Sequence, residues 1–322
     1  MILTVTLNPL LEYCYAYKSV NFGGNNRNPV QQLRAGGKGI NVSRQLKYFG
    51  VDSLNFTFLG GNNGKRIADS LRTEGLSFIS VKTKSESRNA SVVIEENTCR
   101  VTTYFGNNSL VTDEEAEEFK SKLEKMIQNC EIVVFSGSSP CKVTDSIFPF
   151  GIETANKYDK ISVLDTYGDH LNACLECSPT LVHNNLDEIA SSLNLSLAGE
   201  KEILDFLLNV YSKGTKQIYL TNGNNPAYVA NFDYHYKVEH PEIKCVDSTG
   251  SGDAFTAGIV YGHYKDMVFD DFLPLATALG TLNAAGYDVC WVNPEQALNM
   301  TKDVKVIPVG KKMKLVDVTP QK

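Results

Sequence analysis

A glycine-rich segment in the last third of the chain carries the residues best suited to catalysis. This segment, Val246–Asp253 (VDSTGSGD), passes directly into the small and apolar residues of a predicted helix. A glycine turn that opens a helix presents unpaired backbone N–H groups and the positive end of the helix dipole, which together bind anions. A carboxylate in such a cluster repels phosphate, so Asp253 is better suited to be a general base toward an attacking hydroxyl. The alternative is an ordinary turn in which Asp253 caps the helix.

A second glycine-rich segment, Arg34–Ser43 (RAGGKGINVS), also opens a predicted helix. Three glycines around Lys38 allow the backbone to lie flat against a polyhydroxylated ligand, and Asn41 offers hydroxyl groups both a donor and an acceptor. The segment is not a P-loop, because the G-x-x-x-x-G-K-[ST] spacing is absent. It therefore indicates contact with hydroxyl groups and does not imply phosphate binding of the P-loop type.

The elements that must position these segments follow the βαβ pattern of a mostly parallel sheet, because short apolar runs alternate with segments of helical period. Helices are expected over Asn41–Phe49 and Lys65–Glu74, each followed by a glycine that can cap its C-terminus. The predicted strands are Ile2–Leu7, Leu54–Leu59, Phe78–Val81, Ile132–Ser136, Ile161–Asp165, Leu181–His183 and Gln217–Thr221. The expected fold class is α/β.

Two stretches break this rhythm and predict a small sheet of their own. In residues 12–17 a tyrosine occupies every second position. Ser91–Glu95 and Arg100–Phe105 are rich in β-branched and aromatic residues, and no helix is predicted between them. Such an insert commonly serves as a lid over a site on the main sheet. We expect a single domain over residues 1–322, with lid strands inserted at about 12–35 and 88–106.

The overall charge excludes one class of partner. The chain has 322 residues with 31 basic and 37 acidic side chains, which gives a net charge of −6. Nucleic-acid binding needs a dominant basic surface, so no nucleic-acid partner is expected. No apolar run approaches the roughly 18–20 residues of a membrane span, and the N-terminus lacks a basic leader, so neither membrane contact nor secretion is expected. A small anionic ligand stays open, because local cations and backbone dipoles decide its binding.

Eight cysteines, most of them inside apolar stretches, are typical of buried reduced thiols in a cytoplasmic protein. Cys174 and Cys177 form a C-x-x-C pair, which raises the hypothesis of a zinc site. The alternative is a helix or loop with two ordinary thiols, because structural zinc sites usually combine two such pairs. The acidic run Asp113–Glu118 is interpreted as a helix start, with Thr112 and Glu115 as a capping box, and not as a cation site.

The two glycine-rich segments and the Asn8-Pro9 start together resemble the signatures of the ribokinase-like phosphofructokinase B family of carbohydrate kinases, in order and spacing over roughly residues 1–300. The resemblance is greatest to its 1-phosphofructokinase and tagatose-6-phosphate kinase branches. It implies a three-layer α/β/α core with a mostly parallel sheet and a small β-sheet lid. The implied activity is ATP-dependent phosphorylation of a sugar phosphate hydroxyl with Mg²⁺, with fructose 1-phosphate as the leading acceptor. Tagatose 6-phosphate, another sugar, and a catalytically weak nucleotide or sugar-phosphate sensor are the alternatives.

The resemblance also implies roles for individual residues. The catalytic base and the anion hole of the transferred phosphoryl group match Asp253, Gly250, Ser251 and Gly252. The acceptor sugar and its phosphate match Glu12, Gly37, Lys38, Asn41, Arg88 and Ser138. The nucleotide matches Asn185, Glu188, Thr221, Gly223 and Asn283, and Glu188 is expected to hold Mg²⁺ through water.

Several positions depart from the family pattern. Glu12 stands where an aspartate is usual, so a solvated acid at a strand edge is the alternative to a sugar contact. Arg88 suits phosphate oxygens, although an exposed loop arginine is the alternative. The remaining departures are His183-Asn184, Ser139-Pro140-Cys141 and Pro226. None of them is expected to touch the proposed base or the anion hole, so the chemistry is better supported than the identity of the acceptor. The aromatic lid segments leave two further possibilities open: cover for a sugar within one subunit, or pairing with a second lid in a homodimer.

Overall fold

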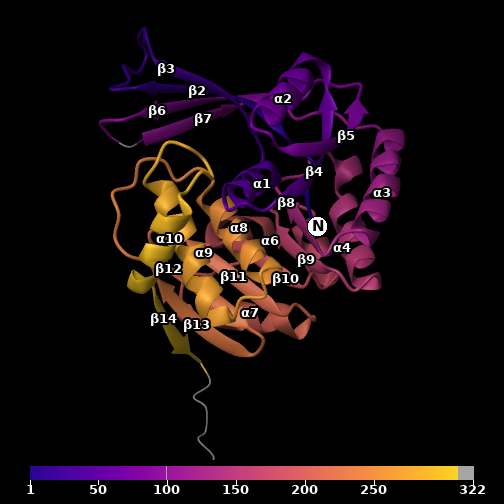
Figure 1. Ribbon diagram of the computed structural model, residues 1–322, viewed down its shortest axis with the longest axis vertical. Helices are drawn as coiled ribbons and strands as arrows, with labels where there is room; N and C mark the ends of the chain where they lie inside the picture. Colours follow the sequence, from indigo (N-terminus) through magenta and orange to yellow (C-terminus); the bar gives the residue numbers. More distant parts are fainter. Residues whose placement is uncertain (99, 311–322) are drawn as a thin grey trace, which may run out of the picture.

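The computed structural model describes residues 1–98 and 100–310, and it confirms the α/β fold class. Within these residues a large, mostly parallel sheet forms the body, and a smaller sheet projects from it at the top of Figure 1. Adjacent strands from β5 to β11 are parallel, and the remaining edge is antiparallel. In spatial order the strands are β5 (Ser77–Thr83), β4 (Ser53–Gly60), β1 (Ile2–Thr6), β8 (Ile132–Ser136), β9 (Ile161–Asp165), β10 (Leu181–Asn185), β11 (Gln217–Asn222), β12 (Asn225–Asn231), β13 (Tyr234–Glu239) and β14 (Lys305–Val309).

Helices cover both faces of the large sheet, and each face has its own apolar core. One core is formed with α3 (Asp113–Gln128), α4 (Ile147–Lys157), α5 (Leu171–Glu176), α6 (Leu186–Leu193) and α7 (Glu200–Ser212). The other is formed with α1 (Lys38–Tyr48), α8 (Ser251–Tyr264) and α9 (Phe269–Ala284). The helices α2 (Gly61–Thr73) and α10 (Pro294–Met300) and two short 3-10 turns, Lys142–Thr144 and Thr301–Asp303, complete the described elements. None of these helices is long and apolar enough to cross a membrane.

Helix α8 packs unusually close to α9, which matters because α8 carries the proposed base in its first turn. A Cβ at Gly258 would lie 2.5 Å from the Cα of Ala276, so only glycine permits this approach. Helix α8 is therefore sandwiched between α9 and the sheet, as Figure 1 shows for the pair of helices. This packing fixes the position of the glycine turn that precedes it.

The smaller sheet is the lid, and its strands lie at β2 (Leu10–Tyr17), β3 (Val30–Gly36), β6 (Arg88–Glu95) and β7 (Arg100–Phe105) in the order β3-β2-β6-β7. Strand β2 follows β1 after a three-residue connection, and β3 leads directly into α1. The base of the lid is therefore continuous with the body. In the register of the lid, Glu12 lies beside Arg34 on β3, and Leu10 lies beside Arg88 on β6. Lid residues of the proposed acceptor site thus meet where the lid joins the body.

The strands β12, β13 and β14 were not among the predicted elements. They form an antiparallel extension that is half exposed, and their sequences mix tyrosine, histidine, asparagine and lysine with small apolar residues. The edge strand β14 and the half-buried β13 need no continuous apolar run, and the buried run of β12, Ala227–Ala230, is short, so apolar periodicity does not reveal these strands.

The acidic run at the start of α3 is a helix cap, as the sequence predicts. Thr112 Oγ1 accepts the backbone N–H of Glu115 at 3.3 Å, and Glu115 Oε2 accepts the N–H of Thr112 at 2.9 Å. The second oxygen of Glu115 accepts the N–H of Lys84 at 2.8 Å. The carboxylates therefore satisfy backbone donors at the positive end of the helix.

The C-x-x-C pair lies at the end of helix α5. Cys174 is buried in the core, and Cys177 caps the helix. Burial raises the pKa of the Cys177 thiol to about 11 and that of Cys174 further, so both sulfurs are held as thiols. Among residues 1–98 and 100–310 there is no group of three or more His, Cys, Asp or Glu side chains placed to hold a metal. The geometry favours the alternative of two ordinary thiols.

Replacing the cap residue provides a test of the α3 assignment. We expect Thr112→Ala to lower the free energy of unfolding by about 1 kcal/mol, because the first turn of α3 loses a side-chain acceptor. Urea unfolding followed by circular dichroism measures the change. Ser121→Ala, an exposed position in the middle of the same helix, is the matched control and should shift the midpoint little. Equal stability of the two variants would contradict the capping role.

Candidate functional site

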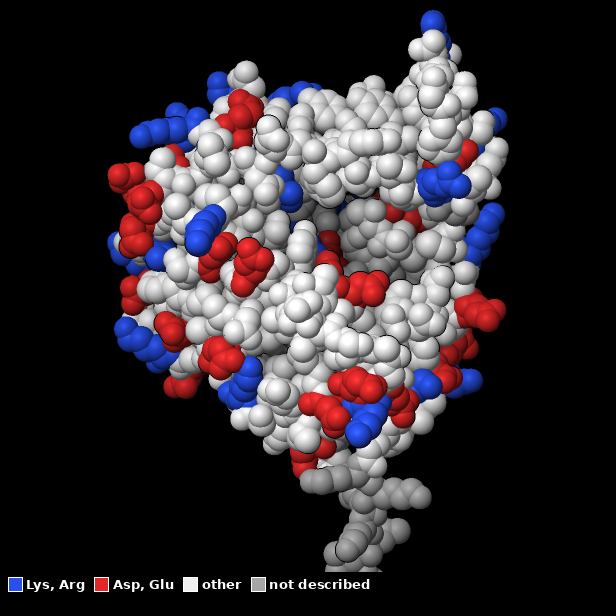
Figure 2. Space-filling view, turned by 180° about the vertical axis from the view of Figure 1, so that it is seen from behind, with Lys and Arg blue, Asp and Glu red and all other residues white. Residues whose placement is uncertain are grey.

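A cavity of about 470 Å³ lies between the lid and the carboxyl ends of the parallel strands. Residues from β1, β8, β9, β10 and β11 or from the connections that follow them line it, together with both glycine-rich segments and the base of the lid. Figure 2 shows this side of the molecule hollowed below the overhanging lid, with acidic side chains inside the hollow and along its lower rim. Ligands of open α/β sheets bind in this crevice. The cavity therefore lies where the fold predicts chemistry.

The glycine turn before α8 forms one wall of the cavity. Gly250 has φ +78°, and a Cβ there would lie 2.3 Å from Cγ1 of Val289, so glycine is required both for the backbone angle and for space. Asp247 Oδ1 accepts the N–H of Thr249 at 2.9 Å and shapes the turn. Helix α8 begins at Ser251, whose N–H donates to the backbone oxygen of Ser248 at 3.1 Å, so the amides of Gly252 and Asp253 are the first-turn donors left to bind an anion at the positive end of the dipole.

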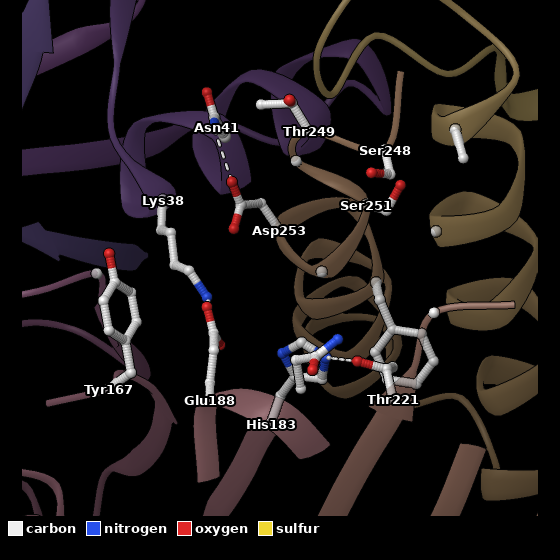
Figure 3. A pocket seen from close by; sticks show the side chains of 18 of the residues that line it. Lys38, Asn41, Tyr167, His183, Glu188, Thr221, Ser248, Thr249, Ser251 and Asp253 are labelled. Carbon is white, nitrogen blue, oxygen red and sulfur yellow. Dashed lines mark hydrogen bonds and ion pairs between the residues drawn. The ribbon is translucent and has the colours of Figure 1, made fainter. Parts of the chain in front are cut away.

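Asp253 lies in this first turn and is almost completely buried, with 4% of its surface exposed. Its Oδ2 accepts a hydrogen bond from Asn41 Nδ2 at 2.7 Å, which joins the two glycine-rich segments across 212 residues of sequence (Figure 3). Burial raises the pKa of Asp253 to about 7; Lys38 opposes the shift and Asp165 adds to it. A carboxyl group with a pKa near neutrality can exchange a proton with a hydroxyl group, which is the property a general base needs.

Lys38 is the central cation of the site. Its Nζ lies 2.9 Å from Asp165 Oδ1 and 3.2 Å from Glu188 Oε2, and 5.3 Å from the centre of the Tyr167 ring. Burial alone lowers the pKa of a lysine, but the two carboxylates hold the pKa of Lys38 well above its ordinary value. In the same way burial would raise the pKa of Asp165, but Lys38 and His183 hold it well below its ordinary range. Lys38 is therefore permanently charged at the floor of the cavity.

His183, one of the departures from the family pattern, is buried behind the glycine turn. Its Nδ1 lies 3.0 Å from the hydroxyl of Thr256 and 3.5 Å from Asp165 Oδ1, and its ring stacks on Phe255. A Cβ at Gly252 would lie 3.1 Å from Cε1 of the imidazole, so the ring supports the turn from below. The neighbouring Asn184 is fully buried and points away from the cavity, since its Nδ2 donates to the backbone carbonyl of the residue after Asp165 at 2.6 Å.

Arg88 lies on the cavity wall at the first residue of β6, where the lid joins the body. Its Nη2 donates to the backbone oxygen of Asn8 at 3.0 Å, its Nη1 donates to Asn108 Oδ1 at 3.3 Å, and its guanidinium lies over the Phe105 ring. The buried Nε has no partner among the described residues. Burial lowers the pKa of this guanidinium, which marks a cation short of solvation. Ser138, also on the cavity wall, accepts from Asn8 Nδ2 at 3.1 Å. The alternative of an exposed loop arginine is wrong.

Glu12 is also at the base of the lid, and it is not a solvated acid. Only 9% of its surface is exposed, and its Oε2 accepts from Arg34 Nε at 2.6 Å. Glu12 lines the cavity, and a Cβ at Gly36 would lie 2.4 Å from its Oε1, so Gly36 makes room for the carboxylate. The ion pair neutralises a carboxylate that would otherwise repel an anionic ligand.

The residues expected near a nucleotide lie mostly along one side of the cavity. Asn185 caps α6 through its Oδ1 and lines the wall with Glu188, one turn further along. Thr221 and Gly223 line it after β11, and Figure 3 shows the Thr221 hydroxyl directed at His183, 3.3 Å from Nε2.

The fifth expected nucleotide residue, Asn283, does not line the cavity. It is 2% exposed, and it donates to the backbone oxygen of Thr249 at 2.8 Å and to Ser251 Oγ at 3.2 Å. Its Oδ1 accepts the N–H of Cys290 at 2.7 Å. The structure therefore places Asn283 beneath the glycine turn, as a brace that holds the turn against the loop after α9.

Three residues of the site were not singled out from the sequence. Asp165 and Asn8 lie at or just beyond the carboxyl ends of β9 and β1, so a polar residue closing an apolar strand was the available signal. Tyr167 lines the cavity beside Lys38, and nothing in its sequence context marks it. The structure is needed to place it.

Comparison with known proteins assigns the chain to a family. Residues 7–294 match the pfkB family carbohydrate kinase. A tagatose-6-phosphate kinase from Staphylococcus epidermidis is 31% identical over 312 residues, which cover 96% of this chain and 100% of that protein. A possible 1-phosphofructokinase from Thermotoga maritima shares the fold with a TM-score of 0.88 at 24% identity, covering 96% and 100% of the two chains. Ribokinase from Arabidopsis thaliana, solved with ribose and ATP, aligns with a TM-score of 0.72 at 17% identity over 93% and 98%.

The family match spans the cavity, both glycine-rich segments and the lid, and the solved structures share the arrangement of the two sheets. The chain therefore belongs to the pfkB family of carbohydrate kinases and is a phosphotransferase that acts on a sugar hydroxyl.

Proposed function

We propose that this protein transfers the γ-phosphoryl group of ATP to a hydroxyl of a sugar phosphate, and that fructose 1-phosphate is its preferred acceptor. The observation that carries the proposal is that a single cavity is lined both by Asp253, a buried carboxyl group suited to act as a base, and by the partly desolvated cation Arg88. An acceptor with a phosphate at one end and a primary hydroxyl at the other spans these two groups. The whole chain acts as one catalytic unit with a lid.

Asp253 and the glycine turn have separate roles in the proposed reaction. Asp253 takes the proton from the attacking hydroxyl while that oxygen forms a bond to the γ-phosphorus and the bond to the bridging oxygen of ADP breaks. The amides of Gly252 and Asp253, which have no acceptor in the turn, hold the oxygens of the phosphoryl group during its transfer. Lys38 supplies positive charge beside them, and closure of the lid excludes water that would compete as an acceptor.

Magnesium fits the chemistry of the donors near Asn185. The Glu188 carboxylate lies on the cavity wall with 29% of its side chain exposed, and the groups around it offer oxygen ligands. Because Mg²⁺ usually keeps several waters and binds one or two carboxylates plus phosphate oxygens, a single accessible carboxylate suffices for it. Glu188 would hold the ion, and bound Mg²⁺ neutralises charge on the nucleotide phosphates.

The acceptor is proposed to be a ketohexose monophosphate. In fructose 1-phosphate and in tagatose 6-phosphate, the phosphate and the free primary hydroxyl are attached at opposite ends of the furanose ring. The same separation of Arg88 and Asp253 therefore serves both sugars, and tagatose 6-phosphate is the second candidate because a tagatose-6-phosphate kinase is 31% identical to this chain. Gly37, Asn41 and Glu12 line the region between the two ends and are proposed to contact the ring hydroxyls.

The lid is proposed to pair with a second lid in a homodimer. Val30, Leu33 and Tyr104 lie on its strands with 74%, 37% and 62% of their surfaces exposed, which is an apolar surface on a projecting sheet. A cytoplasmic location is proposed as well, since Cys14, Cys130, Cys174 and Cys290 are buried free thiols.

Removal of the base is the direct test of catalysis. Asp253→Asn keeps the shape of the side chain and an acceptor for Asn41, but it cannot take a proton. We expect turnover with fructose 1-phosphate to fall about 10²–10⁴-fold with little change in ATP affinity. A coupled assay of ADP release over phosphorylated and unphosphorylated sugars measures it and ranks the acceptors. Wild-type-like turnover of the variant would contradict the base, and ATP binding without ADP release on any acceptor would indicate the sensor.

The raised pKa of Asp253 predicts the pH dependence. The active form is the carboxylate, so kcat/KM should fall as the pH drops through about 7 and level off above it. Asn41→Ala removes a hydrogen bond that lowers the pKa of Asp253, so this acid limb should move to higher pH. A sugar phosphate also titrates near pH 6, but that ionisation is the same for both enzymes. An acid limb at the same pH in the two profiles would contradict the assignment to Asp253.

Arg88 is expected to recognise the phosphate of the acceptor. Charge-assisted hydrogen bonds contribute about 1.5–3 kcal/mol, so Arg88→Gln should raise KM for fructose 1-phosphate by roughly 10–150-fold. KM for ATP should change little. Arg100→Gln removes the same charge from β7, where the guanidinium lies over Phe22, and serves as the control. Equal effects of the two substitutions would show that Arg88 contributes only to the general charge of the lid.

A further inference from the structure

A second cavity of about 560 Å³ lies at the junction of lid and body, apart from the catalytic cavity. Its wall is formed by β3 of the lid, by helix α2 and by the loop around residues 288–291 that follows α9. The size is that of a small-molecule site. No step of the proposed phosphoryl transfer uses it.

Three arginines line this cavity, and two of them have donors left over for a ligand. Each nitrogen of the Arg44 guanidinium already has a partner. Its Nε is 2.6 Å from Glu74 Oε2, and its two Nη atoms donate to oxygens of α1 and β3. Only 7% of the Arg34 surface is exposed, and its Nη2 has no partner among the described residues. Arg66 is exposed at the mouth, and its Nη1 donates to the neutral hydroxyl of Tyr13.

The acidic residues on the wall do not cancel these cations. Glu74 is bound by Arg44, and Asp69 is bound by Arg72 at 2.6 Å. Asp288 is the remaining carboxylate on the wall, and it is exposed on the loop across from α2. Arg66 is therefore the cation of this wall that no described carboxylate pairs with, and Arg34, whose Nε is bound to Glu12, still has an Nη2 group without an acceptor. Planar N–H donors of this kind match the oxygens of a phosphate group.

The same arginines connect this cavity to the catalytic one. Arg34 Nε holds Glu12, which lines the acceptor site, at 2.6 Å. Arg44 Nη1 donates to Asn41 Oδ1 at 2.6 Å, and Asn41 in turn holds Asp253. Both carboxylates that face the acceptor are thus reached from the second cavity through one or two hydrogen bonds.

We propose that the second cavity binds a small phosphate-bearing metabolite and that its occupancy weakens binding of the acceptor. A phosphate group bound by Arg66 and Arg34 shares the Arg34 guanidinium with Glu12. Glu12 is then less well neutralised and repels the phosphate of the acceptor more strongly, so KM for the acceptor rises. This consequence rests on the proposed function, whereas binding in the cavity does not.

The single tryptophan of the chain, Trp291, lines this cavity and reports its occupancy without any catalytic turnover. Inorganic phosphate is titrated into the purified protein at constant ionic strength while the fluorescence of Trp291 is followed. A saturable change is expected. Arg66→Gln should raise the half-saturating concentration at least tenfold, and Arg66→Lys, which keeps the charge, should raise it less. Lys65→Gln removes an exposed cation from the neighbouring position of α2 and should leave the titration unchanged.

Several results would overturn the site. These are the absence of a saturable change, the same change with sodium chloride or with acetate in place of phosphate, or equal weakening in Arg66→Gln and Lys65→Gln. Arg88→Gln separates the two cavities, because it removes the proposed phosphate contact of the catalytic cavity and should leave the Trp291 titration intact. In the kinase assay, phosphate should raise KM for the acceptor less in Arg66→Gln than in the wild type. Saturable Trp291 binding in a protein that transfers no phosphoryl group would refute the proposed function and leave the second site standing.

Discussion

The ion pair between Lys38 and Asp165 is the interaction on which the rest of the site depends. Asp165 is completely buried at the end of β9, where its carboxylate also lies 3.3 Å from the hydroxyls of Ser136 and Thr256. Such a charge is stable in the interior only when it is paired and hydrogen-bonded. The pair joins the first turn of α1 to the centre of the sheet, and through Thr256 it reaches α8. One buried carboxylate therefore fixes the separation of the two glycine-rich segments.

The same pair sets the chemistry of the base. Asp253 lies within a group of carboxylates, and burial together with its acidic neighbours raises its pKa toward 7, while Lys38 limits the rise. Without the cation the carboxyl group would be protonated at neutral pH, and without burial it would be too weak a base. The pKa of Asp253 is thus set by opposing charge–charge interactions in a region of low dielectric. The rigid placement of these groups matters because such interactions fall off with distance. Asn283 contributes to this balance by supporting the turn, whereas His183 both supports the turn and lowers the pKa of Asp165.

The parts of the fold that depend on local pattern could be predicted from the sequence. Apolar runs located β1, β4, β8, β9 and β11, and the capping box located the start of α3, because these features reflect interactions within a few residues. The two glycine segments located Asp253, the proposed base, and Asn41, to which the structure shows it hydrogen-bonded. What the sequence could not show are contacts across long separations. Arg34 pairs with Glu12, Asn283 turns under the catalytic loop, and Tyr167 enters the cavity only because of the packing of whole elements. The strands β12 to β14 were missed because β13 and β14 are mostly half-buried or exposed and the buried run of β12 is short.

A net charge of −6 and an acidic hollow are expected to repel ATP and a sugar phosphate, which together carry several phosphate groups. This repulsion is small because acidic side chains of the cavity are paired with cations. Glu12 and Asp165 are each neutralised at short range by Arg34 and Lys38, so at a distance they act as dipoles whose field falls off steeply. In the proposed function the phosphates are received by groups that carry no compensating acid: the amides at the start of α8 and the partly desolvated Arg88. An acidic protein can bind two anions because its surface charge is screened by salt, whereas the donors inside the cavity are not.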